Sequence, residues 1–184
     1  MPASDAPQIA SFPAELLAEL SRTLTSNLAP ANSAELLRQA GYGMGEPLHR
    51  LLHERALDDD HATAEMAAPE FWPALTDFFA ALGWGELSHQ RLHDGVSALD
   101  AAHWIEAAGD GSPGQPACHF TTGVLADLLR RVADREVAVL EVECRRAGDD
   151  RCRFLFGSET ALQRIYDRVR DGDGYEDAIA ALDD

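Results

Sequence analysis

The sequence contains no lysine, so all 15 of its basic residues are arginine. Against these stand 32 acidic residues, which give a formal net charge of −17 at pH 7. A protein that binds nucleic acid needs a basic surface to neutralise phosphates, and anionic lipid attracts basic segments for the same reason. The charge therefore argues against direct binding to nucleic acid and against docking on a membrane, and we expect neither partner.

Cysteine is also scarce, with three residues in a chain of 184. So small and odd a number does not support the disulfide framework of a secreted domain. No apolar run is long enough to span a bilayer, and the first residues, MPASDAPQIASFP, lack the basic and apolar regions of a signal peptide. We predict a cytoplasmic protein, in which the cysteines serve as metal ligands, nucleophiles or core residues.

The spacing of apolar residues predicts helices in the first part of the chain and hairpins later. Helical periodicity covers residues 13–28, 32–57 and 69–82, and returns over residues 118–137 and 159–172. The dipeptide Asp94-Gly95 predicts one hairpin turn, and residues 147–150 lie between the strands of a second hairpin. The fold class is therefore α+β, with N-terminal helices packed on an antiparallel sheet of two hairpins and a long helix between them.

The domain organisation follows from the same pattern. We predict a disordered N-terminus over residues 1–14 and a single domain over residues 15–184. Pro30 is expected to end the first helix and Asn32 to cap the second. The second helix contains GYGMG, whose three glycines lower helix propensity but permit another element to approach closely.

Two of the three cysteines lie in the segment EVECRRAGDDRC, residues 141–152. Cys144 and Cys152 stand near the mouth of the second hairpin, and Cys118 lies just ahead of the helix between the hairpins. Glu141 or Glu143 can supply a fourth ligand, which makes a zinc site of three thiolates and one carboxylate. Such a set carries a charge of about −4 before zinc binds. Four nearby arginines are placed to screen that charge: Arg145, Arg146, Arg151 and Arg153.

The spacing alone leaves other interpretations of the cysteines open. They can pack in the core, or Cys144 and Cys152 can form a cross-strand disulfide. Joint ligation also meets a geometric objection, because Glu141 and Cys144 differ by three positions and point to opposite faces of a regular strand. A β-bulge or a sharp twist between them is required.

The stretch CHFTTGVLADLLRRVADREVAVLEVECRRAGDDRCRFLF resembles the core of the vinyl-4-reductase domain family. In that family a cysteine, a long helix, Glu-x-x-Cys and a further cysteine bind zinc. The matching positions here are Cys118, Glu141, Cys144 and Cys152, so the resemblance favours Glu141 over Glu143. The upstream segments LLRQAGYGMGEPLHRLL and FFAALGWGELSHQRL are also similar to the family, which extends the resemblance over residues 32–156.

The resemblance implies a structural zinc ion and an α+β fold shared with ligand-sensing and vesicle-tethering proteins. It also implies a pocket between helices and sheet for a phenolic or other hydrophobic molecule, and a homodimer. We predict that Phe78, Trp84 and Trp104 line this pocket. Phenol sensors use a His and a Trp to hold the hydroxyl group, and Trp104 lies too near the strand end to match that pair, so phenol itself is not the expected ligand.

Three classes of function remain. The resemblance favours a small-molecule-binding regulatory module; the others are an accessory protein or enzyme of tetrapyrrole or aromatic metabolism and a structural interaction module. We identify no catalytic residues, because no general acid, nucleophile or cofactor fingerprint stands out. His49 and His53 have helical i, i+4 spacing that suits either a metal or a surface pair, and His119 beside Cys118 suggests a Cys-His nucleophile only if the cysteine is free.

Overall fold

The computed structural model of the chain describes residues 10, 12–58, 68–108 and 116–183. In this part of the chain, the helices are α1 (Glu15–Asn27), α2 (Pro30–Asp58), α3 (Ala68–Ala81), α4 (His119–Ala133), α5 (Glu159–Arg170) and α6 (Tyr175–Ala180). The strands are β1 (Ser88–His93), β2 (Val96–Ala101), β3 (Ala138–Glu143) and β4 (Cys152–Gly157). Short 3₁₀ helices follow β2 at Ile105–Ala107 and β3 at Arg145–Ala147.

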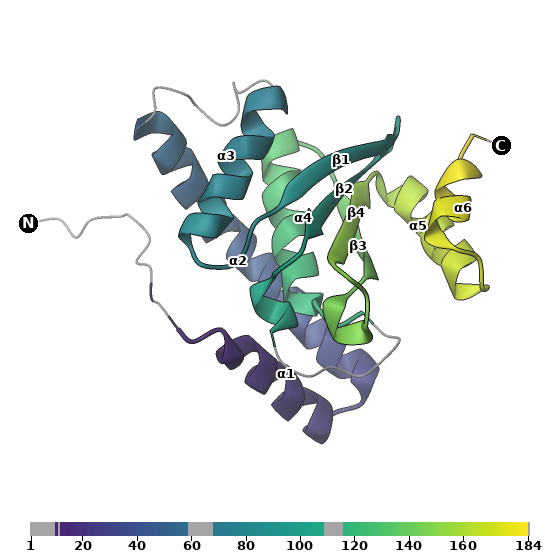
Figure 1. Ribbon diagram of the computed structural model, residues 1–184, viewed down its shortest axis with the longest axis horizontal. Helices are drawn as coiled ribbons and strands as arrows, with labels where there is room; N and C mark the ends of the chain where they lie inside the picture. Colours follow the sequence, from purple (N-terminus) through teal and green to yellow (C-terminus); the bar gives the residue numbers. More distant parts are fainter. Residues whose placement is uncertain (1–9, 11, 59–67, 109–115, 184) are drawn as a thin grey trace, which may run out of the picture.

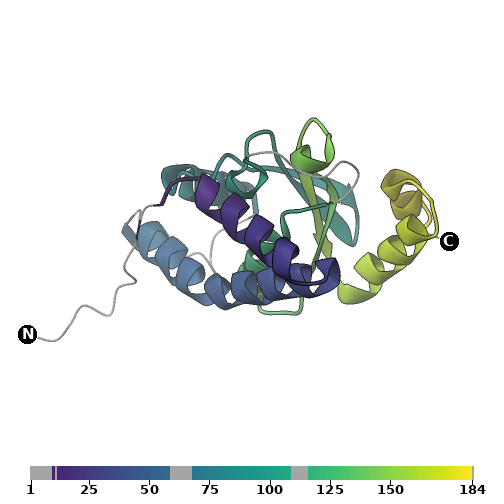
Figure 2. The same ribbon diagram turned by 90° about the horizontal axis from the view of Figure 1, so that it is seen from below.

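The four strands form one antiparallel sheet in the order β1-β2-β4-β3. Each predicted hairpin is present, and the hairpins join through their second strands, so β2 and β4 lie at the centre. Helices α2, α3 and α4 lie on one side of the sheet, and α5 and α6 lie on the other (Figure 1). Seen from below, α6 lies at the far end from α3, whereas the start of α5 lies near the start of α2 (Figure 2). The predicted α+β class is confirmed.

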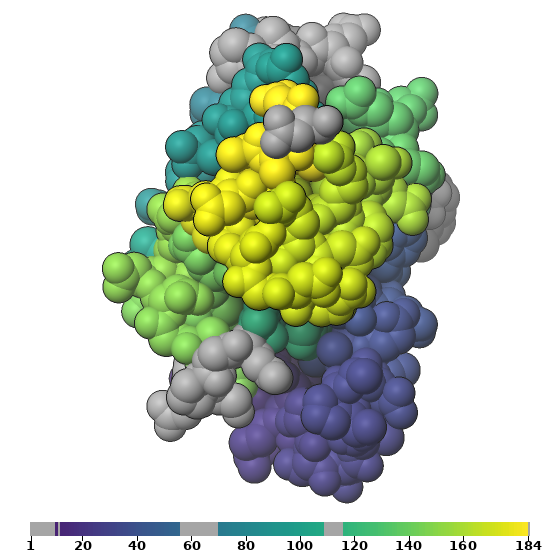
Figure 3. Space-filling model, turned by 90° about the vertical axis from the view of Figure 1, so that its right-hand side faces the viewer, coloured from purple at the N-terminus to yellow at the C-terminus, as the bar shows by residue number. Residues whose placement is uncertain are grey.

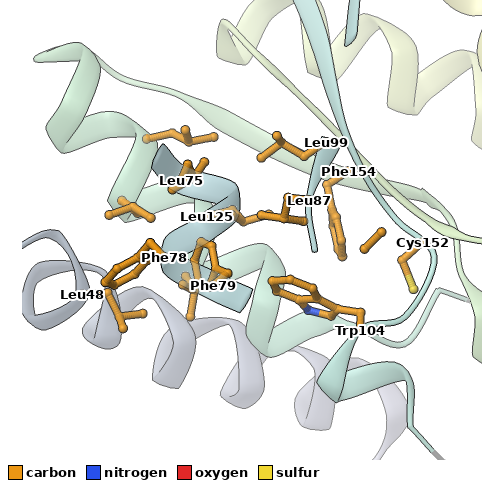
Figure 4. Close-up of a cluster of buried hydrophobic side chains, with 14 of the residues drawn as sticks. Leu48, Leu75, Phe78, Phe79, Leu87, Leu99, Trp104, Leu125, Cys152 and Phe154 are labelled. Atoms are coloured by element: carbon orange, nitrogen blue, oxygen red, sulfur yellow. The ribbon is translucent and has the colours of Figure 1, made fainter. Parts of the chain in front are cut away.

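The sheet separates two apolar cores. Because successive side chains of a strand point to opposite faces, Leu99 and Ala101 of β2 join the core under the N-terminal helices, and Val96 and Ala98 join the core under α5 and α6. The larger core contains Phe78 and other side chains of α3, together with residues of α4 and β4 (Figure 4). Because helices cover both faces of the sheet, the central strands β2 and β4 carry few exposed polar residues.

Helices α2 and α4 pack closely through glycine. A Cβ atom added to Gly41 would lie 2.0 Å from the carbonyl oxygen of Phe120, and one added to Gly123 would lie 2.0 Å from that of Arg38. Only glycine permits backbones to approach so closely. The close approach predicted for GYGMG is therefore confirmed, although Gly43 of the same motif has no atom within 4 Å of an added Cβ.

The boundary between α1 and α2 differs from the prediction. Pro30 is the first residue of α2 and does not end α1, because its fixed φ and its missing N–H suit the first helical turn. Asn32 consequently lies inside the helix and caps nothing. The predicted disordered N-terminus and the polar segment after α2 lie largely outside the described residues. Within the described part of the chain, no helix is both long and apolar enough to cross a bilayer.

Candidate metal centre and neighbouring cavity

The structure brings together the four residues predicted to bind zinc. Cys118 lies at the N-terminal end of α4, Glu141 in β3, Cys144 just after β3, and Cys152 at the start of β4. All four are buried, and their ligand atoms lie within 4.8 Å of one another. The sulfur of Cys118 lies 3.9 Å from that of Cys144 and 3.8 Å from that of Cys152. Sulfur atoms about 3.8 Å apart suit a tetrahedral zinc ion with bonds of about 2.3 Å.

A β-bulge places Glu141 and Cys144 at the same site. In the β3–β4 ladder Glu141 is paired with Phe154 and Glu143 with the adjacent Arg153, so two steps along β3 correspond to one along β4. The extra residue reverses the usual alternation beyond it. The structure therefore contains the β-bulge that Glu141 and Cys144 need in order to bind the same metal ion. Glu143, the other candidate ligand, is instead paired with Arg151 at 2.6 Å.

The carboxylate of Glu141 has one oxygen available for a metal. Its Oε2 accepts a hydrogen bond of 2.8 Å from the backbone N–H of Cys118. Its Oε1 is buried and has no hydrogen-bond partner. A buried acceptor left without a partner is costly, and a metal ion would satisfy it. Three sulfur atoms and this oxygen form a donor set that fits zinc.

The thiols of the cluster are free. Cys144 and Cys152 are both among these free cysteines, so the cross-strand disulfide between them is not formed in this structure. Burial raises the pKa of the Glu141 carboxyl to about 9. Hydrogen bonds from the Cys118 and Cys152 thiols lower the pKa of Cys144. Without a metal, the cluster therefore holds protons to limit its charge, and a metal cation would take their place.

The screening role predicted for Arg151 and Arg153 is wrong. Arg153 makes two hydrogen bonds of 2.7 Å to the carboxylate of Asp100, and Arg151 pairs with Glu143. These ion pairs connect β2, β3 and β4 and leave neither guanidinium directed at the thiols. The guanidinium of Arg145 donates to a backbone carbonyl of the loop after β2. The N-terminal end of α4, where Cys118 lies, supplies a favourable positive potential instead.

Glu106 is a buried acid near this centre that the sequence did not reveal. Its carboxylate accepts hydrogen bonds from the backbone N–H groups of Phe120 at 2.9 Å and Thr121 at 2.7 Å, so it caps the first turn of α4. It is 1% exposed, and burial raises its pKa to about 7. No capping motif points to it, because it lies outside α4 in the chain, in the 3₁₀ helix after β2.

Replacing Glu106 by glutamine is expected to remove a pH dependence of stability. The folded-state pKa of about 7 exceeds the ordinary value of 4.5. The contribution of Glu106 to the free energy of unfolding is therefore complete when the pH lies below the ordinary pKa. It is lost as the pH rises through the folded-state pKa. Between about pH 5 and about pH 8, we expect the free energy of urea unfolding to fall by about 3 kcal/mol more in the native chain than in Glu106→Gln. Equal slopes in both proteins would contradict the assignment.

The aromatic residues predicted to line a pocket lie in the larger core. Phe78 and Trp104 are 2% and 4% exposed, and Trp104 donates a hydrogen bond of 2.7 Å to Thr121. Trp84 is half-buried and packs against Phe79. Figure 4 shows Phe78, Phe79 and Trp104 among the aliphatic side chains of this core. Their burial gives them a packing role in this structure.

A cavity of about 470 Å³ lies beside that core, between α3, the end of α4 and the sheet. Apolar side chains make up much of its lining: Phe71, Trp72, Val96, Leu129, Val132, Val137 and Phe156. Trp72 is held in place by stacking on His89, with ring centres 3.9 Å apart and planes 5° from parallel. Arg91, Asp94 and Arg135 add charged groups to the lining. The volume suits a small organic molecule.

The remaining histidine candidates do not join a metal cluster. His49 and His53 stack with ring centres 6.4 Å apart on α2. Across the described residues, the cysteine centre is the only group of three or more potential ligands close enough to share an ion. His119 follows Cys118 into α4 and lines a separate groove beside β3.

Comparison with protein families supports the resemblance seen in the sequence. Residues 100–158 match the model of the vinyl-4-reductase domain family, a stretch that runs from β2 to just beyond β4. It contains all four residues of the cysteine centre and less than half of the chain. A comparison with curated proteins gives no match.

Two solved structures with TM-scores above 0.5 share the fold at low sequence identity. The phenol-responsive sensory domain of the transcription activator PoxR, solved with phenol, is 15% identical, with a TM-score of 0.60 over 82% of this chain and 76% of that one. Subunit 3 of a trafficking protein particle complex from Naegleria fowleri, covalently bound to palmitic acid, is 14% identical, with a TM-score of 0.58 over 78% of this chain and 91% of that one. A vinyl-4-reductase family protein from Methanocaldococcus jannaschii is 20% identical, with a TM-score of 0.42 over 83% and 98% of the two chains.

Proposed function

From the vinyl-4-reductase domain match over residues 100–158, we propose that the chain is a small-molecule-binding module with a structural zinc ion. Cys118, Glu141, Cys144 and Cys152 would hold the zinc. Four protein ligands leave no open position for water or substrate, which is typical of a structural and not a catalytic site. The observation that supports the metal is the buried, partnerless Oε1 of Glu141 facing three free thiols.

The zinc ion would connect three parts of the fold that are distant in sequence. Its ligands come from the start of α4, the end of β3 and the start of β4. Bound zinc supplies folding free energy because the site is not preformed in the unfolded chain. The resulting rigid junction fixes α4 against the sheet, and the end of α4 forms one wall of the cavity.

The cavity is the proposed ligand site, and its ligand a hydrophobic or aromatic molecule. The apolar lining and the volume of the cavity support this proposal. The two proteins that share the fold offer support, since one was solved with phenol and the other with palmitic acid. A sensing role follows if ligand binding alters contacts with another protein. The homodimer and the cytoplasmic location stay predictions.

Filling the cavity is expected to weaken ligand binding. Val132→Trp adds an indole from the α4 wall, whereas Val169→Trp adds the same group at an exposed position on α5 and serves as the control. Titration with the apolar dye 1-anilinonaphthalene-8-sulfonate should show saturable binding to the native chain and the control. We expect affinity to fall about tenfold or more in Val132→Trp. Equal affinity in all three proteins would contradict the proposed site.

A further inference from the structure

β3 is an edge strand whose outer side has no strand partner. Within the described part of the chain, the sheet order places β4 on one side of β3 and no strand on the other. Among the described residues, no backbone hydrogen bond joins β3 to any segment other than its sheet neighbour. The outward N–H and C=O groups of an edge strand are a template for pairing with another chain.

A groove of about 610 Å³ runs along this edge. Four consecutive residues of β3, from Ala138 to Glu141, line it. One wall comes from the first turns of α2 and α4, and the other from α5. Figure 3 views the molecule from this side, with α5 above the first part of α2. Much of the wall surface is small or apolar: Pro30, Ala31, Ala34, Pro116 and Leu162.

We infer that this groove binds an extended segment of a partner protein, which pairs with β3 and extends the four-stranded sheet. In strand addition, main-chain hydrogen bonds supply affinity and the pockets for alternate side chains supply specificity. The short side chains of Ala31 and Ala34 leave room for the partner's apolar side chains. The groove carries both Arg38 and Glu159, and the whole chain has a net charge of −17, so the long-range field of the chain attracts a basic segment and repels an acidic one. The segment that fits best therefore alternates apolar and basic residues.

A separate segment fits the groove better than a second copy of this chain does. β3 lies between walls formed by α2, α4 and α5. Another copy would present the same recessed strand, so its own walls would meet these before the two strands could pair. A single extended segment has no such walls.

The groove is distinct from the proposed small-molecule site. The two share no lining residue, so either can fail experimentally without the other. Glu141 lines the groove and also belongs to the cysteine centre. A metal-bound Glu141 would thus hold the end of the pairing edge in position.

The test uses linear peptides longer than β3, selected from a random phage-displayed library against the full chain and titrated by calorimetry. Ala34→Trp fills the groove from α2. Ala40→Trp adds the same side chain at an exposed position of that helix outside the groove and is the control. We expect selected peptides to alternate apolar and basic residues, to lose about tenfold or more in affinity for Ala34→Trp, and to bind the control as they bind the native chain.

Backbone methylation of the peptide tests strand pairing itself. N-methyl groups on one set of alternate residues should abolish binding, and those on the other set should leave it unchanged, because only every second N–H faces β3. Failure to select any peptide, affinity unaffected by Ala34→Trp, or indifference to N-methylation would each overturn the inference. Dimerisation of the chain that Ala34→Trp abolishes would also overturn it, in favour of a second copy as occupant.

Discussion

Chains with Cys152 replaced by serine are expected to purify without zinc and to lose cooperative unfolding of the sheet. Structural zinc contributes on the order of 10 kcal/mol of binding free energy in small zinc domains, which is comparable with the whole stability of a typical domain. Cys152 begins a central strand and is fully buried, so the effect should reach both cores. Native mass spectrometry would measure zinc per chain, and thermal unfolding would measure the loss of stability.

The two glutamates on β3 supply a matched control for this prediction. Glu141→Gln should weaken zinc retention, because a neutral amide is a poorer ligand than a carboxylate. Glu143→Gln should retain one zinc ion per chain, although it loses the ion pair with Arg151. Unaltered zinc content and melting temperature in Cys152→Ser would end the structural zinc proposal. Loss of zinc in Glu143→Gln but not in Glu141→Gln would show that the fourth ligand is misassigned.

Gly41→Ala is expected to destabilise the fold by about 3 kcal/mol, the upper range for an overpacked core. The added methyl group would lie 2.0 Å from the carbonyl oxygen of Phe120. Because that oxygen belongs to the backbone of α4, relief requires the two helices to separate along their whole contact. Urea unfolding would measure the change in the free energy of unfolding.

Gly43→Ala is the control, two residues along the same helix. Gly43 is exposed and has no atom within 4 Å of an added Cβ. Alanine there should stabilise the chain by about 0.5–1 kcal/mol, because it raises helix propensity without a clash. Changes of the same sign and size in the two variants would contradict the close helix contact.

Several features were predictable from the sequence because their causes are local. Helical spacing of apolar residues located α1, α4 and α5, and Asp94-Gly95 located the first hairpin. The glycines of GYGMG predicted a close helix contact, although only the structure shows that Gly41 makes it and Gly43 does not. Predictions from local sequence succeeded wherever neighbouring residues alone determine the conformation of the backbone.

The candidate metal centre, formed by the three cysteines and Glu141, was only partly predictable from such local rules. The Glu-x-x-Cys spacing and the resemblance identified its four residues, but regular strand geometry placed Glu141 and Cys144 on opposite faces. The β-bulge that unites them is set by pairing with β4. Arg151 and Arg153 were assigned to the wrong charges for a related reason. Arg153 lies in the same strand as Cys152, yet its partner Asp100 comes from β2.

By itself, the sequence determined the α+β class and the two hairpins, because periodicity and turn residues are properties of short segments. It also identified the four residues of the cysteine centre, where the family resemblance selected Glu141 over Glu143. Tertiary structure alone decided that Glu106 caps α4, that Trp72 and Phe156 line the cavity while Trp104 fills the core, and that β3 is left at an edge. Each of these depends on which distant segments meet, and that is decided by how the helices and strands pack together.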